Sequence, residues 1–367
     1  MDRNLDISVL MPTHNRAAIL RDTLEAMTRV RRDGLEVEFV VVDNASTDDT
    51  REVIGSYAKR LPVRRVYEPR PGKNRALNRA LAEAELGRIV VFTDDDVTPR
   101  RDWLLAIHDV CARRPEYSVF GGQIHAVWPS DKVPGWALDP FIHAFGFAHH
   151  DYAKEERPYA PDEFPFGPNY WVRREVFADG LRFYEHIGPH PRNRILGDET
   201  LFLKQLRGHG FEPFYTPKAL VGHRIQPENF SAAAIVKRAA TLGRGAPVVN
   251  GLCQADLLHS HPHIWRLRRR MALWWYALRY LRARLTRDHD RQVVRSVHAI
   301  FNMAYNRASL ELARHDGHLP DPNPSSAPEA SSEPPPPAEA APPRSAEPAR
   351  TADAAAKKLR SVHGSQC

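Results

Sequence analysis

Three consecutive carboxylates, Asp94, Asp95 and Asp96, stand where the apolar run 89–92 (IVVF) ends. Carboxylates packed this closely repel one another, so they need a stabilising charge nearby. A hard divalent cation with oxygen ligands is the usual stabiliser, and Mg²⁺ bound in this way commonly also holds the phosphates of a substrate. The simpler alternative is a solvated acidic turn before a helix, so the triplet alone does not decide between the two.

Short apolar runs rich in β-branched residues occur at 7–11, 37–42 and 89–93. Their unbroken apolarity predicts strands buried on both faces of a parallel sheet. Helical spacing of apolar residues separates them, in 18–30, 47–59 and 74–86. Strands alternating with helices indicate an α/β layer fold, which binds ligands at the carboxyl ends of its strands. The polar clusters 12–16, 43–46 and 94–96 all fall at those ends.

The remainder of the chain divides by composition. Residues 120–195 are irregular and rich in aromatic residues, Pro and His, and order returns with a helix after Gly197 and short strands at 211–215 and 219–221. Residues 230–315 are helical and basic in pattern. From Pro320 onward, a Pro- and Ala-rich composition predicts a disordered tail. We therefore expect three parts, at 1–228, 229–318 and 319–367.

Charge and cysteine content limit the class of protein. The 367 residues carry a formal net charge of +7, which favours anionic partners such as nucleotides or a lipid surface. Cys111, Cys253 and Cys367 are widely spaced, which argues for a reducing compartment and against a zinc ribbon. No secretory signal or membrane-spanning run is expected, so we predict a cytoplasmic protein.

An ordered set of motifs resembles family 2 glycosyltransferases with a GT-A fold. It comprises ISVLMPTHNR, VVVDNASTDDT, RPGKNRALNRAL, FTDDDVTPRRDWL, FGPNYWVRREVF and GDETLFLKQLRGHGFEPFYTPKALVGH, over roughly residues 5–225. The resemblance implies a mostly parallel α/β sheet flanked by helices. It also implies transfer of a sugar from a nucleoside diphosphate, above all a UDP-sugar, to a hydroxyl acceptor with inversion. The acceptor would be a glycan or a lipid-linked sugar in surface polysaccharide or glycolipid assembly.

The resemblance assigns the donor to the strand ends. Asp43 would accept a hydrogen bond from the base, and the helix N-termini and basic side chains would bind the diphosphate. The alternatives are helix caps, an Asx turn and an ordinary basic loop. The full donor set is Pro12, Thr13, Asn15, Arg16, Asp43, Asn44, Lys73, Asn74, Asn78, Asp94 and Asp95.

The resemblance also implies a metal and a base. Asp96, with Asp94 and His223, would hold Mg²⁺ or Mn²⁺, which neutralises charge on the leaving diphosphate. His223 is equally well a structural histidine. Glu199 would be the general base, although the family usually reads Glu-Asp where this chain reads Asp198-Glu199, so the two acids remain alternatives. Both acids are also explained as first-turn residues of a helix.

The acceptor side is assigned to Asn169, Tyr170 and Trp171, with core packing of Trp171 as the alternative. The His-rich segments (His143, His149, His150, His259, His261 and His263) could suggest zinc, but no supporting ligand spacing accompanies them.

The segment 265–287 holds eight arginines and no acid, with Leu267, Met271, Trp274, Leu278, Leu281 and Leu285 spaced by three and four. This pattern is typical of an amphipathic helix on the inner, anionic face of the plasma membrane, or of a helix packed on the catalytic domain. No nucleic-acid module accompanies the charge.

Three other functions fit the sequence less well. A sugar nucleotidyltransferase would need a Gly-rich signature after the first strand, where this chain has Pro-Thr-His-Asn-Arg. A catalytically degenerate, membrane-associated interaction protein would lack a metal or base carboxylate, and neither is missing. A Rossmann dehydrogenase is disfavoured because no GxGxxG follows the first strand.

Overall fold

The computed structural model describes residues 5–189, 195–251 and 262–314. The predicted disordered tail and its boundary at residue 319 lie outside these residues. The described part belongs to one compact unit that the contacts do not divide near residue 228, so the boundary between 228 and 229 stays a prediction.

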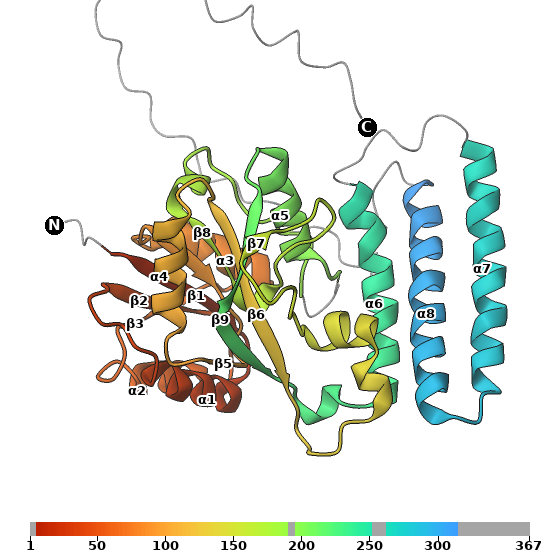
Figure 1. The fold of residues 1–367 in the computed structure, drawn as a ribbon, viewed down its shortest axis with the longest axis horizontal. Coiled ribbons are helices and arrows are strands. Elements are labelled where there is room, and N and C mark those ends of the chain that lie inside the picture. Colours follow the sequence, from red (N-terminus) through yellow and green to blue (C-terminus); the bar gives the residue numbers. More distant parts are fainter. Residues whose placement is uncertain (1–4, 190–194, 252–261, 315–367) are drawn as a thin grey trace, which may run out of the picture. The chain divides into compact units, whose positions relative to one another are not determined.

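One large sheet forms the centre of the N-terminal part of the described chain (Figure 1). The strands, in spatial order, are β3 (Val63–Tyr67), β2 (Val37–Asp43), β1 (Ile7–Thr13), β4 (Ile89–Phe92), β8 (Tyr170–Arg173), β6 (Val119–Val127), β9 (Pro213–Arg224) and β5 (Val97–Pro99), and β7 (Arg157–Pro158) pairs with β9. The strands β3, β2, β1 and β4 are parallel, and β8 joins β4 antiparallel. The mostly parallel α/β fold predicted from the sequence is confirmed.

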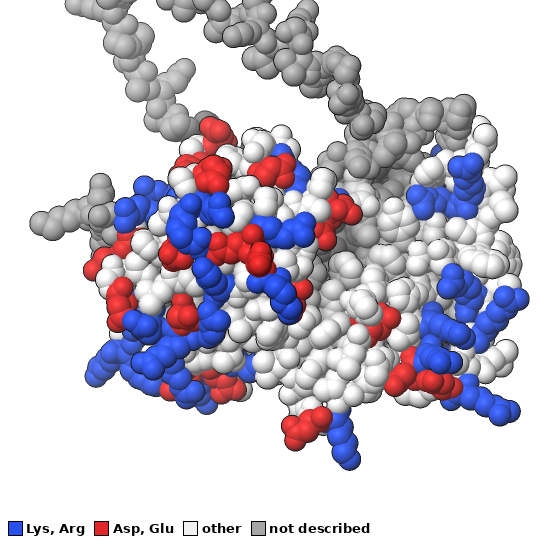
Figure 2. Space-filling model, in the orientation of Figure 1, with Lys and Arg blue, Asp and Glu red and all other residues white. Residues whose placement is uncertain are grey.

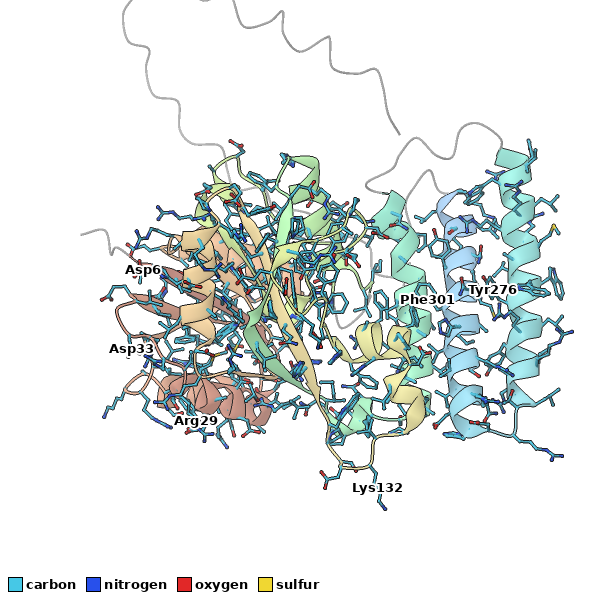
Figure 3. The ribbon with its side chains drawn as sticks, viewed as in Figure 1. Asp6, Arg29, Asp33, Lys132, Tyr276 and Phe301 are labelled. Carbon is cyan, nitrogen blue, oxygen red and sulfur yellow. The ribbon has the colours of Figure 1, made fainter. Side chains whose placement is uncertain are left out.

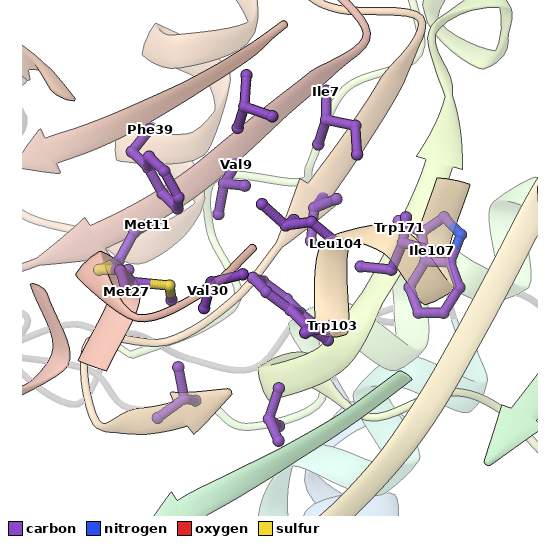
Figure 4. Packing of buried hydrophobic residues seen from close by; sticks show 14 of the residues in the cluster. Ile7, Val9, Met11, Met27, Val30, Phe39, Trp103, Leu104, Ile107 and Trp171 are labelled. Carbon is purple, nitrogen blue, oxygen red and sulfur yellow. The ribbon is translucent and has the colours of Figure 1, made fainter. Parts of the chain in front are cut away.

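The parallel strands are buried on both faces, as their unbroken apolarity predicts. Val9 and Met11 of β1 pack in one cluster and Leu10 in the other, because successive strand residues point to opposite faces. The first cluster, shown in Figure 4, lies under α1 (Ala17–Thr28), α2 (Thr50–Ser56) and α4 (Trp103–Arg113). The second lies under α3 (Lys73–Glu83) and α5 (Asp198–Gly208).

Strand register brings the predicted polar clusters together. Thr13 pairs with Asp43 at the ends of β1 and β2, and Leu10 pairs with Phe92 in β4. The aspartate triplet begins two residues after the end of β4, and the neighbouring strand β1 ends in Thr13. This register confirms that the polar clusters gather at one edge of the sheet.

Three long helices complete the described chain: α6 (Ala232–Gly251), α7 (Pro262–Arg284) and α8 (His289–Leu312). Helix α8 contacts both α6 and α7. In Figure 3, the labelled Phe301 of α8 and Tyr276 of α7 mark these helices. Gly243 lets α6 approach α8 closely, since a Cβ there would lie 2.2 Å from the carbonyl oxygen of Phe301. No helix in the described ranges is long and apolar enough to cross a membrane.

Two features of the sheet were not predicted. Residues 63–67 (VRRVY) form β3, in which Val63, Arg64 and Arg65 are half-buried, Val66 is buried and Tyr67 is exposed. Residues 213–224 form the single strand β9 instead of two short strands, with an irregularity opposite Gly122 and Gln123. The described helices of the irregular segment and of the approach to α6 are short turns: η1 (Gly135–Leu138), η2 (Ile142–Gly146), η3 (Gly167–Asn169), η4 (Arg174–Phe177) and η5 (Pro227–Asn229).

Candidate active site

A cavity of about 710 Å³ opens at the carboxyl ends of the parallel strands. This volume lies within the range of small-molecule sites. Residues from β1, the start of α3, the aspartate triplet, the start of α5 and β9 line it. The predicted site residues that line it are Pro12, Thr13, Arg16, Asn44, Lys73, Asp94, Asp95, Asp96, Asp198, Glu199 and His223.

Asp95 is fixed by bonds from the first strand and helix. The Thr13 hydroxyl donates to its Oδ2 at 2.6 Å, and the Arg16 guanidinium donates to its Oδ1. Burial raises the pKa of Asp95 to about 7, against the opposing charge of Arg16. Asp95 therefore ties the triplet to β1 and α1, and its own oxygens are already engaged.

Asp96 keeps one oxygen available. Arg16 donates to its Oδ2 at 2.8 Å, while its buried Oδ1 accepts no hydrogen bond from any described residue. The Nε2 of His223 lies 3.4 Å from that Oδ1, because β5 and β9 pair Val97 with His223. Burial alone would raise the pKa of Asp96, but His223 and Arg16 hold it below its ordinary value.

His223 is oriented by the backbone. Its Nδ1 lies 2.8 Å from the carbonyl oxygen of Phe147, so Nδ1 carries a proton and donates it there. Its Nε2 then faces Asp96. Burial lowers the pKa of His223, and the contact with Asp96 outweighs this and raises it. Two electron-rich atoms facing each other at this distance need a proton or a metal cation between them.

Lys73 joins the aspartate triplet to the acids of α5. Its Nζ donates to Asp94 Oδ1 at 2.8 Å and to Glu199 Oε1 at 2.6 Å. Burial lowers its pKa, but Asp94 and Glu199 together raise it well above the ordinary value. Lys73 follows Gly72, whose φ of +139° strongly favours glycine, at the start of α3. The Lys73 ammonium is thus a fixed cation between two carboxylates.

Glu199 and Asp198 begin α5 but have different surroundings. Glu199 has a side chain 23% exposed, and Lys73 overcomes burial to lower its pKa to about 2. Asp198 is buried, with an Oδ2 that accepts no hydrogen bond among the described residues. Burial, reinforced by the charge of Glu199, raises the pKa of Asp198 well above its ordinary value. At neutral pH, the ionised and reachable carboxylate is therefore Glu199.

Glycines make room for both acids. Gly197 has a φ of +112° directly before them. A Cβ at Gly167 would lie 2.5 Å from Glu199 Oε1, and one at Gly188 would lie 3.2 Å from Asp198. The φ of Gly197, together with the 2.7 Å that would separate a Cβ there from Val249 Cγ2, explains why a glycine precedes the pair, which a role as first-turn acids does not explain.

The residues at the end of β2 hold loops in place. Asp43 is buried and accepts from Arg65 at 2.6 Å and from the Ser46 backbone at 3.0 Å. Asn44 donates to the carbonyl of Arg70 at 2.8 Å and accepts from the Gly72 backbone at 2.7 Å. Asp43 does not line the cavity. The nucleotide base of a donor could bond to its carboxylate only if Arg65 shared that carboxylate.

Three other donor candidates also make internal bonds. Asn15 accepts from the Thr47 backbone at 2.7 Å. Asn74 donates to the carbonyl of Ile187 at 2.8 Å, and Asn78 donates to that of Phe183 at 2.9 Å. None of the three asparagines lines the cavity, and their side chains form hydrogen bonds with the backbone of neighbouring loops.

The three acceptor candidates are buried, which corrects the expectation that their side chains contact an acceptor. Asn169, Tyr170 and Trp171 are at most 1% exposed. Asn169 accepts from Trp103 Nε1 at 2.9 Å and donates to the carbonyl of Ala219 at 2.8 Å. Core packing, the alternative considered for Trp171, is what the structure shows: Trp171 packs in the first hydrophobic cluster and Tyr170 in the second, on opposite faces of the sheet.

The wall of the cavity opposite the sheet was not predicted. It includes Phe145 of η2, Phe147 directly after η2, Phe166 directly before η3, and Arg238 and Leu242 of α6. The only sequence signal was the density of aromatic residues in the irregular segment. Among the described residues, no group of three or more His, Cys, Asp or Glu could hold a metal ion. His259 and His261 lie outside the described residues.

Comparisons with known proteins agree with this geometry. A family model described as glycosyl transferase family 2 matches residues 8–180. Glycosyltransferase AglE of Haloferax volcanii is 21% identical over 242 residues, which cover 65% of this chain and 72% of that protein. The putative teichuronic acid biosynthesis glycosyltransferase TuaG of Bacillus subtilis is 32% identical over 142 residues, or 38% of this chain and 52% of that protein.

Other matches are shorter or more distant. The probable glycosyltransferase YdaM of Bacillus subtilis is 30% identical, but the match spans only 24% of that protein. Among solved structures, the mannosyltransferase PcManGT of Pyrobaculum calidifontis, in complex with GDP-Man and Mn²⁺, is 20% identical. That match has a TM-score of 0.48 and covers 87% of this chain and 78% of that one. Residues 8–180, slightly less than half of this chain, are similar to glycosyl transferase family 2.

Proposed function

We propose that this glycosyltransferase moves a sugar from a nucleoside-diphosphate donor to a hydroxyl of a glycan or lipid-linked acceptor, with inversion at the anomeric carbon. The observation that carries the proposal is the bridge from Asp94 through Lys73 to Glu199 in one cavity. It places a carboxylate that can accept a proton beside cationic groups that can bind a diphosphate. The name of the relative TuaG refers to teichuronic acid biosynthesis, which supports a role in surface polysaccharide or glycolipid assembly.

In the proposed reaction, Glu199 accepts the proton of the acceptor hydroxyl while the oxygen of that hydroxyl bonds to the anomeric carbon. The bond from that carbon to the diphosphate oxygen breaks in the same step, and its electrons stay on the diphosphate. A single displacement of this kind inverts the configuration. A correctly placed general base contributes about 10²–10⁴-fold to such a rate.

Lys73 and Arg16 would bind the diphosphate. Both are cations on the cavity wall, and both are now occupied by carboxylates. A phosphate oxygen competes for the Lys73 ammonium with Glu199, because charge-assisted bonds to phosphate are strong. Donor binding would therefore loosen the ion pair that holds the pKa of Glu199 low, and so increase the basicity of Glu199 when the acceptor arrives.

Asp96 and His223 fit a divalent cation because each presents a potential ligand atom to the other. Asp96 Oδ1 is buried without a hydrogen bond among the described residues, and His223 Nε2 faces it at 3.4 Å. Asp96 and His223 would hold Mg²⁺ or Mn²⁺, with Asp94 as a further candidate from the triplet. The cation would neutralise charge on the leaving diphosphate. Since the described residues contain no complete set of protein ligands, the diphosphate and water would supply the rest.

The test is a thermal-shift and calorimetric comparison of UDP, GDP and CDP with and without Mn²⁺. A ligand that binds the native state raises its stability by mass action. One nucleoside diphosphate should raise the melting temperature, and Mn²⁺ should increase the effect. Asp96→Ala should remove the Mn²⁺ dependence while the protein stays folded. If EDTA leaves sugar transfer unchanged, the metal assignment is wrong.

The place of the reaction is part of the proposal. Nucleotide sugars are expected in the cytoplasm, and a lipid-linked acceptor would present its sugar at the inner face of the plasma membrane. Fractionation of cells that express the tagged full chain, with detection in the cytoplasmic and inner-membrane fractions, would test this location. Recovery from the extracytoplasmic fraction alone would contradict it.

A further inference from the structure

Helix α7 has two apolar sides, and only one of them is packed. Its inner side faces α8, where Ala283 is 1% exposed and Tyr276 is half-buried. On the same side, the guanidinium of Arg269 lies 5.1 Å from the centre of the Tyr305 ring of α8 and donates to Asn306 at 3.1 Å. These contacts attach α7 to the rest of the molecule.

The opposite side carries large apolar side chains in open solvent. We call it the outer stripe, and it consists of Ile264, Leu267, Met271, Trp274, Leu278, Leu281 and, just after the helix, Leu285. Their spacing of three and four residues places them along one line of the helix. Every member is more than 40% exposed, and Trp274 reaches 80%. A continuous apolar strip of this kind marks a binding surface.

Arginines flank the outer stripe on both sides. At about 100° per residue, Arg268, Arg279 and Arg282 fall along one edge, and Arg270 and Arg284 fall along the other. No Asp or Glu occurs from 262 to 287, and no ion pair joins these five arginines to a described acid. Figure 2 shows Lys and Arg separated by uncharged surface over the α7 side of the molecule.

We propose that the outer stripe lies in the plane of an anionic lipid bilayer. The apolar line would enter the boundary between headgroups and acyl chains, and the two arginine edges would contact anionic headgroups. A second copy of this chain fits less well, since placing two outer stripes together would bring arginine edges against each other with no acid between them. A nucleic acid would use the arginines but leave the apolar line in water.

The experiment is flotation of the full chain with two kinds of vesicle. One contains phosphatidylcholine and phosphatidylglycerol at 7:3, and the other contains phosphatidylcholine alone. Binding to the anionic vesicles is expected at low salt. It should weaken at 0.5 M NaCl, because attraction between exposed charges is screened. Vesicles that carry brominated lipid should quench tryptophan fluorescence, and Trp274→Phe should bind but lose much of this quenching.

Two variants separate the apolar and ionic parts. Trp274→Ser with Leu278→Ser interrupts the outer stripe, and Arg268→Gln, Arg270→Gln, Arg279→Gln and Arg282→Gln together neutralise its edges. Each variant should weaken binding to anionic vesicles at least about ten-fold, the first because it removes apolar surface that would enter the bilayer and the second because it removes four charges near the headgroups. The matched control neutralises four exposed cations of the catalytic half, Arg29, Arg51, Lys59 and Arg101, and should bind within about three-fold of the unchanged chain.

Other outcomes would overturn the proposal. Equal binding by the charge variant and its control would show that net charge alone attracts the protein. A dimer in sedimentation that Trp274→Ser with Leu278→Ser abolishes, without vesicle binding, would assign the outer stripe to a second copy. Absence of both a dimer and vesicle binding would also refute it. Sugar transfer to a water-soluble acceptor is independent of these results, so the proposed function is tested separately.

Discussion

Lys73 is the residue on which the chemistry of the cavity depends, because it links the aspartate triplet to the candidate base. The sequence placed Lys73 near the donor but gave no sign that it reaches Glu199, 126 positions further along the chain. That contact depends on how α3 and α5 pack on one face of the sheet, and no local pattern encodes it. The choice between Asp198 and Glu199 likewise required the burial of each carboxylate, which a two-letter motif does not reveal.

Glu199→Gln should leave donor binding intact and lower the rate of transfer by about 10²–10⁴-fold, because the amide keeps the shape but cannot accept the proton. Asp198→Asn should have a smaller effect on that rate, since the carboxyl of Asp198 is buried and both burial and the charge of Glu199 raise its pKa well above the ordinary value. The measurement is kcat for both variants, with donor affinity from calorimetry. A severe loss in Asp198→Asn with a mild one in Glu199→Gln would reverse the assignment.

Lys73→Met should raise the pKa of Glu199, because it removes the cation that holds that pKa at about 2 and leaves burial unopposed. The acidic limb of the profile of kcat/KM against pH should then move to higher pH, and donor binding should weaken. Lys73→Arg keeps the charge and should retain most of the acidic limb at its original position. An unchanged profile in Lys73→Met would show that Glu199 does not control that limb.

At the scale of the elements, the sequence predicted best where local pattern and burial agree. The runs that became β1, β2 and β4 are mostly apolar, and these strands are buried on both faces. β3 was missed because Arg64 and Arg65 interrupt its apolar pattern; Arg64 forms an ion pair with Glu38 of β2, and Arg65 forms one with Asp43. The assignment of Asn169, Tyr170 and Trp171 to the acceptor failed because a motif gives residue types but does not show that these side chains are buried.

Helix α6 positions the start of α5. A Cβ at Gly245 would lie 2.2 Å from the carbonyl oxygen of Leu196, and the Val249 side chain lies close to Gly197. Gly245→Ala should therefore displace the segment that carries Glu199 and lower kcat more than it weakens donor binding. Overpacking of this kind costs about 1–3 kcal/mol of stability.

The control for Gly245→Ala is Gly208→Ala on α5 itself, where no described atom outside the helix backbone lies within 4 Å of the added carbon. It should leave kcat and stability nearly unchanged. Chemical denaturation and steady-state kinetics of both variants decide the question. Equal kinetics in the two variants would mean that α6 does not position the acids.

At the scale of the whole molecule, ion pairs join segments that are distant in sequence. Glu156 accepts from both terminal nitrogens of Arg113 on α4 at 2.7 Å and from the Thr216 hydroxyl of β9 at 3.0 Å. Arg113 lowers the pKa of Glu156 to about 2, against the effect of burial. No sequence pattern predicted this connection, because its three partners come from separate elements.

The lowered pKa of Glu156 predicts a pH dependence of stability. A carboxylate with a folded-state pKa below its unfolded value stabilises the fold above about pH 4.5, and this contribution is lost as the pH falls toward 2. Glu156→Gln should reduce the free energy of unfolding by about 2 kcal/mol at pH 7 and by much less at pH 3. Urea titrations at both pH values measure this, with the exposed Glu116→Gln as control. A difference that does not change with pH would contradict the assignment.

The order of the last three helices determines how far the cavity lies from the outer stripe. α6 borders the cavity, α8 lies against α6, and α7 lies against α8. Packed helices are about 8–10 Å apart between axes, so two such steps separate the cavity border from the helix with the outer stripe. If that stripe rests on lipid, the protein would hold its cavity at a fixed distance from the bilayer. It would extend glycans whose accepting end already projects well above the bilayer, and a sugar attached directly at the headgroup would be out of its reach.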